Sequence, residues 1–250
     1  MPAITQERAP QVFVQIPCLN EAATIGEVVE SIPRSIEGLG DVTTVVVDDG
    51  SSDASVAVAR EAGADHVITH HRHEGLGPTF FRGLQWSLEH GADIIVNTDG
   101  DGQYPSSAIP RLIAPLVEEK ADLVVAQRLT PDGYYKPWEE QVRKMGSSLI
   151  RKLTGVDVDD PVSGFRAMSA AHAASLHRHT TFSYTLDTIV QARGFEVANV
   201  PVETRFVPRE SRLRKNTTEY LHYTALDLYY AIKQVAYKNK IAERFNLRLT

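Results

Sequence analysis

The amino-acid sequence predicts an α/β fold in which helices flank a mainly parallel sheet. Short apolar runs rich in Val and Ile alternate with stretches of helical periodicity along the first half of the chain. This alternation is typical of parallel strands that are joined by crossover helices. Polar clusters rich in Asp, Gly and Ser follow several of the apolar runs, where strand propensity stops and helix capping begins. The 250 residues, 42% of them hydrophobic, suffice for the core of one large domain or two small ones.

The first half of the chain contains five predicted strands in the order of a doubly wound sheet. In the first helix, apolar residues recur at helical spacing from Ile25 to Ile32, and Pro33 closes the helix. The second helix opens at capping residues within 48–53 and runs through Ala62. The predicted strands are 12–16, 44–47, 66–69, 94–97 and 123–126, and the remaining helices are 79–89 and 109–118.

The second half of the chain is less regular. It predicts a helix at 138–153, a short strand at 163–168, a helix at 184–193, a strand at 195–202, a basic loop at 205–215 and a helical pattern from 218 to about 240. No linker separates two domains, so the simplest organisation is one α/β domain, residues 1–215, with a C-terminal helical extension, residues 216–250.

Composition and charge exclude several classes of protein. The net charge is −6, but the chain from Arg205 onward carries ten Lys and Arg against four Asp and Glu, so the excess of negative charge lies in the first 204 residues. This balance argues against general nucleic-acid binding, which needs a basic face along the phosphates. The single cysteine, Cys18, cannot form an internal disulfide, and there is no apolar run of about 20 residues. We therefore expect a cytoplasmic protein without a signal segment or membrane span.

Three polar loops follow predicted strands, at residues 17–21, 48–53 and 99–104. Ligands of open parallel sheets bind beyond the carboxyl ends of the strands, where such loops converge. Acidic side chains are costly to cluster there unless they bind a cation or hydrogen-bond donors. The loops therefore indicate a site for a metal ion, or for a ribose and base.

The run Asp99-Gly100-Asp101 is the sharpest single feature of the sequence. Two carboxylates separated by one glycine can turn toward one hard cation such as Mg or Mn, and Gln103 offers a neutral oxygen nearby. A cation with few protein ligands keeps positions open for diphosphate oxygens and assists a departing nucleotide. By itself the run favours an ordinary Asp-Gly turn over a metal site. The glycine-rich fingerprints of dinucleotide-binding dehydrogenases and of P-loop hydrolases are absent from the sequence.

The ordered set of motifs resembles glycosyltransferase family 2. The segments that carry the resemblance are Pro17-Cys-Leu-Asn-Glu21, Asp48-Asp-Gly-Ser-Ser-Asp53, Gly75-Leu-Gly77, Asp99-Gly-Asp-Gly-Gln103, Ser163-Gly-Phe-Arg-Ala167 and Ser211-Arg-Leu213. Within the family, the chain is similar to the branch of dolichyl- and polyprenyl-phosphate sugar synthases, over about residues 11–215. The resemblance implies a GT-A fold, a nucleotide-sugar donor, a divalent cation and inversion at the anomeric carbon.

The resemblance also implies roles for individual positions. Those expected at the donor are Pro17, Leu19, Glu21, Asp48, Asp49 and Gly75; those expected at the metal and diphosphate are Asp99, Asp101 and Gln103; those expected at the acceptor and departing phosphates are Arg128, Ser163, Arg166, Ser211 and Arg212. The planar fork of arginine suits phosphate oxygens, and a basic loop can close over a bound diphosphate. Without the resemblance, the basic loop reads as solvated surface.

A general base is needed only for some acceptors. A neutral hydroxyl is a poor nucleophile and requires a base, whereas a phosphate acceptor is already ionised at neutral pH. Asp187 matches a position that is usually acidic in the branch and is the candidate for a catalytic base, although a helix-surface carboxylate explains it too. The acidic cluster from Asp157 to Asp160 is another possibility, and a turn cap explains it equally well.

The acceptor and the C-terminal helix remain open at this point. The sequence lacks the hydrophobic C-terminal segments of many branch members, so the acceptor is either polyprenyl phosphate or a soluble sugar or natural-product hydroxyl. The tyrosine-rich helical pattern from residue 218 has three possible roles: packing on the domain, packing on a second subunit, or docking on a bilayer. We expect packing. A non-catalytic nucleotide-sugar-binding module is a further alternative, against which the Asp99 and Asp101 pair argues. The histidines of 70–73 predict a polar loop that borders the donor pocket at His73, and no zinc site.

Overall fold

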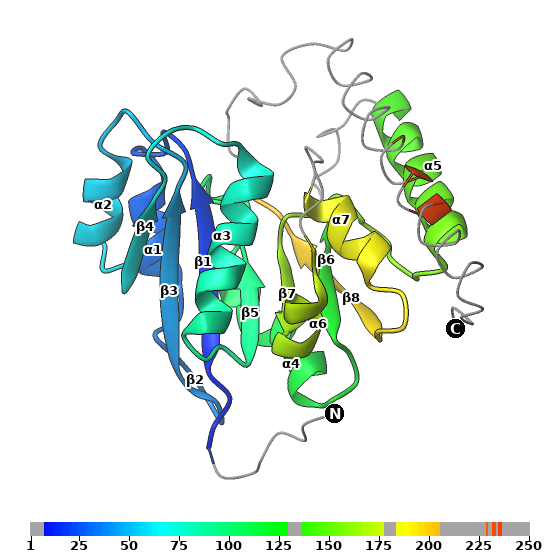
Figure 1. Ribbon diagram of the computed structural model, residues 1–250, viewed down its shortest axis with the longest axis horizontal. Helices are drawn as coiled ribbons and strands as arrows, with labels where there is room; N and C mark the ends of the chain where they lie inside the picture. Colours follow the sequence, from blue (N-terminus) through cyan, green and yellow to red (C-terminus); the bar gives the residue numbers. More distant parts are fainter. Residues whose placement is uncertain are drawn as a thin grey trace.

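A mixed, mostly parallel sheet of eight strands organises the molecule (Figure 1). The computed structural model describes residues 8–129, 137–177 and 184–205, together with 229, 232, 233, 235 and 236. The strands are β1 Val12–Cys18, β2 Ser35–Ile36, β3 Gly40–Asp48, β4 His66–Thr69, β5 Ile94–Asn97, β6 Leu123–Leu129, β7 Arg166–Ser169 and β8 Val197–Glu203. The predicted α/β class and the positions of all the predicted strands are confirmed.

The sheet has the strand order β2-β3-β1-β5-β7-β6-β8, with β4 paired to β3. β1 runs parallel to both β3 and β5, and β6 runs parallel to β8. β7 lies between β5 and β6 and is antiparallel to both. The predicted short strand therefore exists, but it separates the two parallel parts of the sheet, an arrangement that local strand propensity does not encode.

The helices follow the predicted order, with small differences at their ends. They are α1 Ile25–Ser31, α2 Ser55–Glu61, α3 Leu76–Glu89, α4 Ile109–Val117, α5 Pro137–Thr154, α6 Ala170–Ser175 and α7 Tyr184–Gln191, with a 3₁₀ turn at Ser106–Ala108. α3 begins three residues before the predicted start at Thr79, because Gly75 adopts a φ of 102° at the N-cap and Pro78 is tolerated in a first helical turn. The short elements β2 and α6 and the 3₁₀ turn were not predicted.

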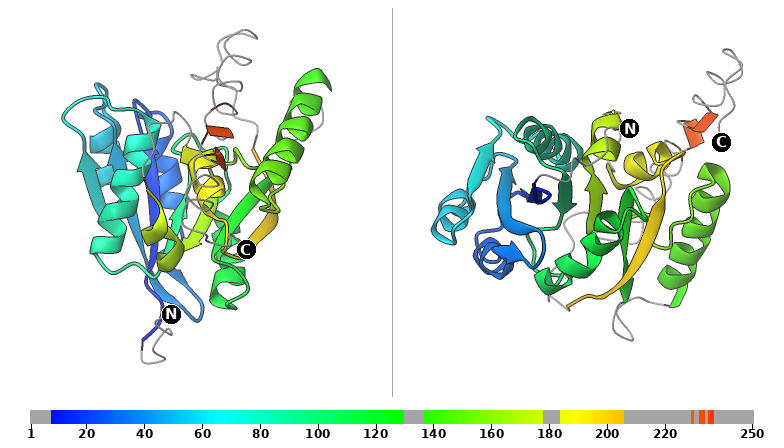
Figure 2. Two further views of the ribbon diagram at one scale, coloured as in Figure 1. Left: turned by 45° about the vertical axis from the view of Figure 1, so that its right-hand side comes forward. Right: turned by 90° about the horizontal axis from the view of Figure 1, so that it is seen from below.

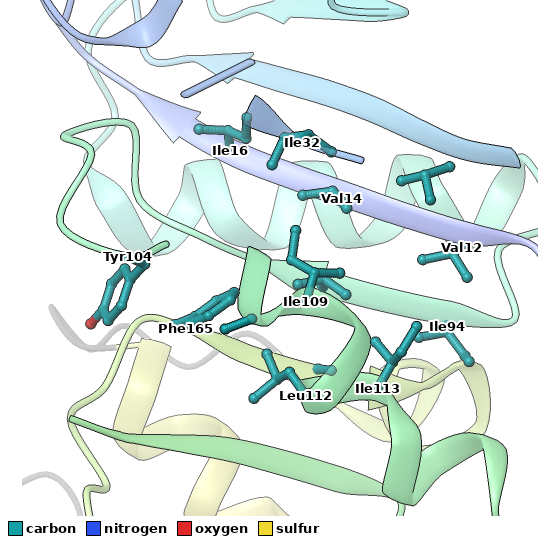
Figure 3. Close-up of a cluster of buried hydrophobic side chains, with 14 of the residues drawn as sticks. Val12, Val14, Ile16, Ile32, Ile94, Tyr104, Ile109, Leu112, Ile113 and Phe165 are labelled. Carbon is teal, nitrogen blue, oxygen red and sulfur yellow. The ribbon is translucent and has the colours of Figure 1, made fainter. Parts of the chain in front are cut away.

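Helices cover both faces of the sheet, so the core has two parts. Side chains of β1 alternate between them: Val12, Val14 and Ile16 pack in a cluster with α1 and α4 (Figure 3), whereas Phe13 packs in the other cluster with α3 and α7. α5 lies beyond β8, at the opposite edge of the sheet from α2 (Figure 2). The carboxyl ends of β1, β3 and β5 consequently open at one edge, between helices that are fixed by the core.

Some sequence predictions concern residues that the structure does not describe. Most of the basic loop and most of the helical pattern after residue 218 lie outside the described residues, as do Ser211 and Arg212. Within the described part of the chain, no helix combines the length and apolar character that crossing a bilayer requires.

Candidate active site

The three polar loops lie together at the carboxyl ends of β1, β3 and β5. Cys18 at the end of β1 is in register with Asp48 at the end of β3, and β5 pairs with the other side of β1. Thr24 Oγ1, at the N-cap of α1 just after the first loop, donates a hydrogen bond of 2.8 Å to the carbonyl oxygen of Gly100 in the third loop. Sequence reasoning predicted this convergence.

The first loop is held in shape by the second. The backbone N–H of Asn20 donates to Ser51 Oγ at 2.8 Å, and that of Glu21 donates to Ser55 Oγ at 2.7 Å. Asn20 adopts a left-handed φ of 50°, which asparagine tolerates better than most residues. Pro17 is buried at the end of β1, while Leu19 and Glu21 are half-buried beside the opening. Ser51 and Ser55 therefore fix the backbone of the loop that is expected to hold the nucleoside.

The two neighbouring acids Asp48 and Asp49 have different surroundings. Asp48 is buried and accepts a hydrogen bond of 3.1 Å from the backbone N–H of Ser51. Asp49 is also buried and accepts from the N–H groups of Glu74 and Gly75 at 2.7 and 2.9 Å, with His73 Nδ1 2.7 Å from Oδ2. Asp49 and Gly75, both predicted at the donor, thus bind each other and fix the start of α3.

Asp99 and Asp101 follow β5 and present carboxylates at the opening. Asp99 keeps part of its surface open to solvent, yet its low-polarity surroundings raise its pKa to about 7, and the nearby charge of Asp101 adds to the rise. The charges of Arg128 and Arg166 act in the opposite direction. Asp101 Oδ1 accepts from the N–H of Gln103 at 3.0 Å, which closes the turn. A pair of carboxylates that repel each other in this way is what a bound cation would relieve.

The donor set of this turn fits a hard divalent cation. Carboxylate oxygens and the amide oxygen of Gln103 are ligands of the kind that Mg²⁺ and Mn²⁺ prefer. Over residues 8–129, 137–177 and 184–205, no group of three or more His, Cys, Asp or Glu side chains is arranged to hold a metal ion. A cation held by Asp99, Asp101 and Gln103 alone would keep positions for diphosphate oxygens or water.

A second charged cluster lies beside the acidic pair. Arg128, in β6, donates from Nε and Nη2 to the two carboxylate oxygens of Asp160 at 2.7 and 2.9 Å, and Arg143 of α5 donates to the same carboxylate at 3.2 Å. The two guanidinium groups hold the pKa of the buried Asp160 below its usual range against the effect of burial. The three side chains together carry two positive charges and one negative charge. Sequence reasoning missed Arg143, because a charged residue on a helix is typical of a solvated face.

Ser163 and Arg166, predicted near the phosphates, are fully buried. The guanidinium of Arg166 donates to the carbonyl oxygens of Ser163 and Thr185 and to Thr188 Oγ1. The expected contact of Arg166 with phosphate stays a prediction. In the structure, its hydrogen bonds connect the Ser163 segment to α7.

The candidate base Asp187 lies in the first turn of α7 and is 2% exposed. Asp157 and Asp159 pair with Arg151 at 3.5 and 3.2 Å, at the outer side of the cluster. The histidines after β4 lie in a loop, as predicted, and His73 contacts Asp49 at the border of the opening.

Comparison with known proteins identifies the family to which the chain belongs. The family described as "Glycosyl transferase family 2" matches residues 13–175. Undecaprenyl-phosphate mannosyltransferase of Micrococcus luteus is 33% identical over 218 residues, 80% of this chain and 85% of that protein. Polyprenol monophosphomannose synthase of Mycolicibacterium smegmatis is 30% identical over 217 residues, 81% of this chain and 80% of that protein.

Solved structures show the same fold. Glucosyl-3-phosphoglycerate synthase from Mycobacterium tuberculosis, in complex with Mn²⁺, UDP and glucosyl-3-phosphoglycerate, matches with a TM-score of 0.71 and 22% identity, over 91% of this chain and 80% of that one. A further structure of that synthase contains Mg²⁺ and UDP. At this identity the likeness concerns the fold. The chain thus belongs to glycosyl transferase family 2 and is a glycosyltransferase with the GT-A fold.

Proposed function

We propose that this glycosyltransferase moves a sugar from a nucleoside-diphosphate sugar to the phosphate of a polyprenyl phosphate, with inversion at the anomeric carbon. The observation that carries the proposal is the pairing of two clusters of opposite charge at one opening, Asp99 with Asp101 and Arg128 with Arg143. The first suits a cation with a diphosphate, and the second suits an anionic acceptor. The names of the two bacterial relatives support the same acceptor class.

The donor half of the site consists of the three loops at the strand ends. We assign the nucleoside to Pro17, Leu19, Glu21 and Asp48, with Asp49 and Gly75 fixing the adjacent backbone. Asp99, Asp101 and Gln103 would hold Mg²⁺ or Mn²⁺, as the ions in the structural neighbours suggest. When bound, the cation supplies Lewis-acid stabilisation of the departing diphosphate.

The acceptor half of the site is the cluster of Arg128, Arg143 and Asp160. A phosphate monoester carries about 1.5 to 2 negative charges at neutral pH, so it complements the two guanidinium groups of the cluster. Asp160 orients the guanidinium of Arg128 by two hydrogen bonds, and guanidinium groups suit phosphate oxygens. The nearby acidic pair would repel a phosphate that approached without a cation. We therefore expect the cation to be bound when the two substrates occupy the site.

The reaction requires one bond to form and one to break. An oxygen of the acceptor phosphate attacks the anomeric carbon from the face opposite the diphosphate, and the nucleoside diphosphate leaves with the electron pair of the broken bond. An ionised phosphate needs no general base. The assignment of Asp187 as a base therefore belongs to the alternative in which the acceptor is a hydroxyl, and an Asp187→Asn variant with an unchanged pH profile supports the phosphate.

The basic segment begins at the proposed metal loop. The backbone N–H of Arg205 donates to the carbonyl oxygen of Gln103 at 2.9 Å. Ser211 and Arg212 follow a few residues later, and we assign them to the departing diphosphate on the basis of the family motif. Arginine suits this role because its planar fork can bind two phosphate oxygens at once.

A lipid acceptor also requires access to a membrane surface. Met145 and Leu149 lie one helical turn apart on α5 and are exposed, as are Tyr229 and Ile232 near the end of the chain. Lys233 and Lys144, which pairs with Glu140, lie beside these apolar side chains in the sequence. We infer a peripheral contact of α5 and of the segment that carries Tyr229 and Ile232 with anionic lipid.

The test is a panel of nucleotide sugars incubated with Mn²⁺, with and without polyprenyl phosphate, in which release of nucleoside diphosphate is measured. The proposal predicts release that depends on Mn²⁺ and on the lipid. Release that needs only a sugar or natural-product hydroxyl would identify the alternative acceptor, and no release with any donor and acceptor would contradict the proposal.

A further inference from the structure

Gly164 lies directly against the carboxylate of Asp99. A Cβ atom added to Gly164 would lie 2.8 and 2.9 Å from the two carboxylate oxygens of Asp99, and 3.1 Å from the hydroxyl of Tyr184. Gly164 is not among the glycines with positive φ. The backbone conformation at this position is one that other residues can adopt. Glycine is required here because the carboxylate of Asp99 leaves no space for a side chain.

Both polar groups of Gly164 are held by side chains from other elements. Its carbonyl oxygen accepts from Asn97 Nδ2 at 2.9 Å, and its N–H donates to the hydroxyl of Tyr104 at 3.2 Å. The second N–H of Asn97 donates to the hydroxyl of Tyr184 at 3.1 Å. Asn97, Tyr104 and Tyr184, called here the Gly164 clamp, are all buried.

The orientation of the clamp is itself fixed. Asn97 Oδ1 accepts from Gln15 Nε2 at 3.0 Å, and Gln15 Nε2 also lies 3.3 Å from the carbonyl oxygen of Phe80. A flipped Asn97 amide would face the amino group of Gln15 with another amino group, so only one orientation satisfies the network. The ring of Tyr184 stacks on that of Phe80 at 4.1 Å between centroids. The clamp thus links β1, β5, α3 and α7.

We propose that Asn97, Tyr104 and Tyr184 are positioning residues that hold Gly164 as a rigid wall and so set the carboxylate of Asp99 in place for the divalent cation. This inference rests on the proposed function, since it concerns the cation site of that reaction. A carboxylate that faces a like charge needs an imposed position, and the neighbouring carboxylate of Asp101 accepts a hydrogen bond from the N–H of Gln103 within its own turn. The wall supplies a constraint from the opposite side.

The test is the affinity of the full chain for Mn²⁺ alone, measured by calorimetry or by the electron paramagnetic resonance of free Mn²⁺. Gly164→Ala places a methyl group against Asp99 and is expected to weaken binding by at least about tenfold, as changes to groups behind metal ligands do. Gly146→Ala, on α5, is the matched control, because no atom of the residues that the structure describes lies within 4 Å of its added Cβ. It should leave the Mn²⁺ affinity unchanged.

Tyr104→Phe gives a second variant, because it removes only the hydroxyl that accepts from Gly164. Weaker Mn²⁺ binding at an unchanged or slightly lower melting temperature supports the positioning role. A lower melting temperature with the wild-type affinity in both variants overturns it and leaves a purely structural network. If Gly164→Ala does not fold, the Mn²⁺ affinity and melting temperature of Tyr104→Phe alone decide between the positioning role and the structural one. A wild-type chain that binds no Mn²⁺ contradicts the proposed cation site, and the inference with it.

Discussion

The raised pKa of Asp99 predicts that the affinity for Mn²⁺ depends steeply on pH. A carboxylate must be ionised to bind a metal ion, and Asp99 ionises near pH 7 in place of the ordinary 3.8. Its ionised fraction falls about 25-fold between about pH 7.5 and 5.5, which corresponds to about 2 kcal/mol of binding free energy. An ordinary aspartate would be almost fully ionised throughout, so its contribution would be flat.

The assay is calorimetric titration of the metal-free protein with MnCl₂ at a series of pH values, in pairs of buffers with different ionisation enthalpies. Near pH 6 the binding of each Mn²⁺ should release about one proton, and well above pH 7 it should release about none. A dissociation constant that changes less than about twofold across this range, without proton release, would refute the reasoning.

The same shift has a consequence for stability whose sign is fixed. The native state of the metal-free protein keeps a proton on Asp99 between pH 3.8 and about 7, whereas the unfolded chain does not. This group therefore lowers the free energy of unfolding as the pH rises through that range. Added Mn²⁺ should raise the melting temperature more at high pH than at low pH.

Loss of either acidic carboxylate, as Asp99→Asn or Asp101→Asn, should lower turnover by at least about a hundredfold with the fold retained, and full turnover with Mn²⁺ still bound would contradict the cation site. Arg128→Met removes two side-chain hydrogen bonds of the buried Asp160 and should lower the free energy of unfolding by about 3 kcal/mol in urea, so an unchanged midpoint would speak against this pair. Because the native pKa of Asp160 is lowered, its stabilisation should be present above its unfolded pKa of 3.8 and disappear as the pH falls through the native value. Arg212→Ala should impair donor use and turnover, with Arg212→Lys recovering only part; unaltered kinetics in both would make the loop ordinary surface. The protein should sediment with anionic vesicles at low salt and less at high salt, and indifference to vesicles at any salt would contradict the membrane contact.

The strands were predictable because their signal is local. Val45, Val46 and Val47 form an apolar run that is buried on both faces of the sheet, and such runs are recognisable without knowledge of their partners. The placement of β7 between β5 and β6 was not predictable, since Arg166 to Ser169 reveals strand character but no pairing partner. The early start of α3 was missed because Gly75, Gly77 and Pro78 have poor helix propensity.

The site was predictable in its loops but not in its side-chain partners. The carboxyl ends of parallel strands meet at one edge, so the convergence of Asp48 and Asp99 follows from strand order. The bonds of Asp49 to the N–H groups at the start of α3 depend on how the β4–α3 loop returns to β3. The pairing of Arg143 with Asp160 joins a helix to a distant turn, and no spacing in the sequence reports it.

The most direct test of the acceptor is phosphorus NMR of polyprenyl phosphate during the reaction with Mn²⁺ and the nucleotide sugar that is active in the panel. Transfer to the acceptor phosphate converts its monoester resonance into that of a phosphodiester, while nucleoside diphosphate accumulates in equal amount. The account predicts both changes in the wild-type chain and neither in Asp101→Asn. Nucleoside diphosphate that accumulates while the lipid monoester resonance stays unchanged would contradict the proposed acceptor.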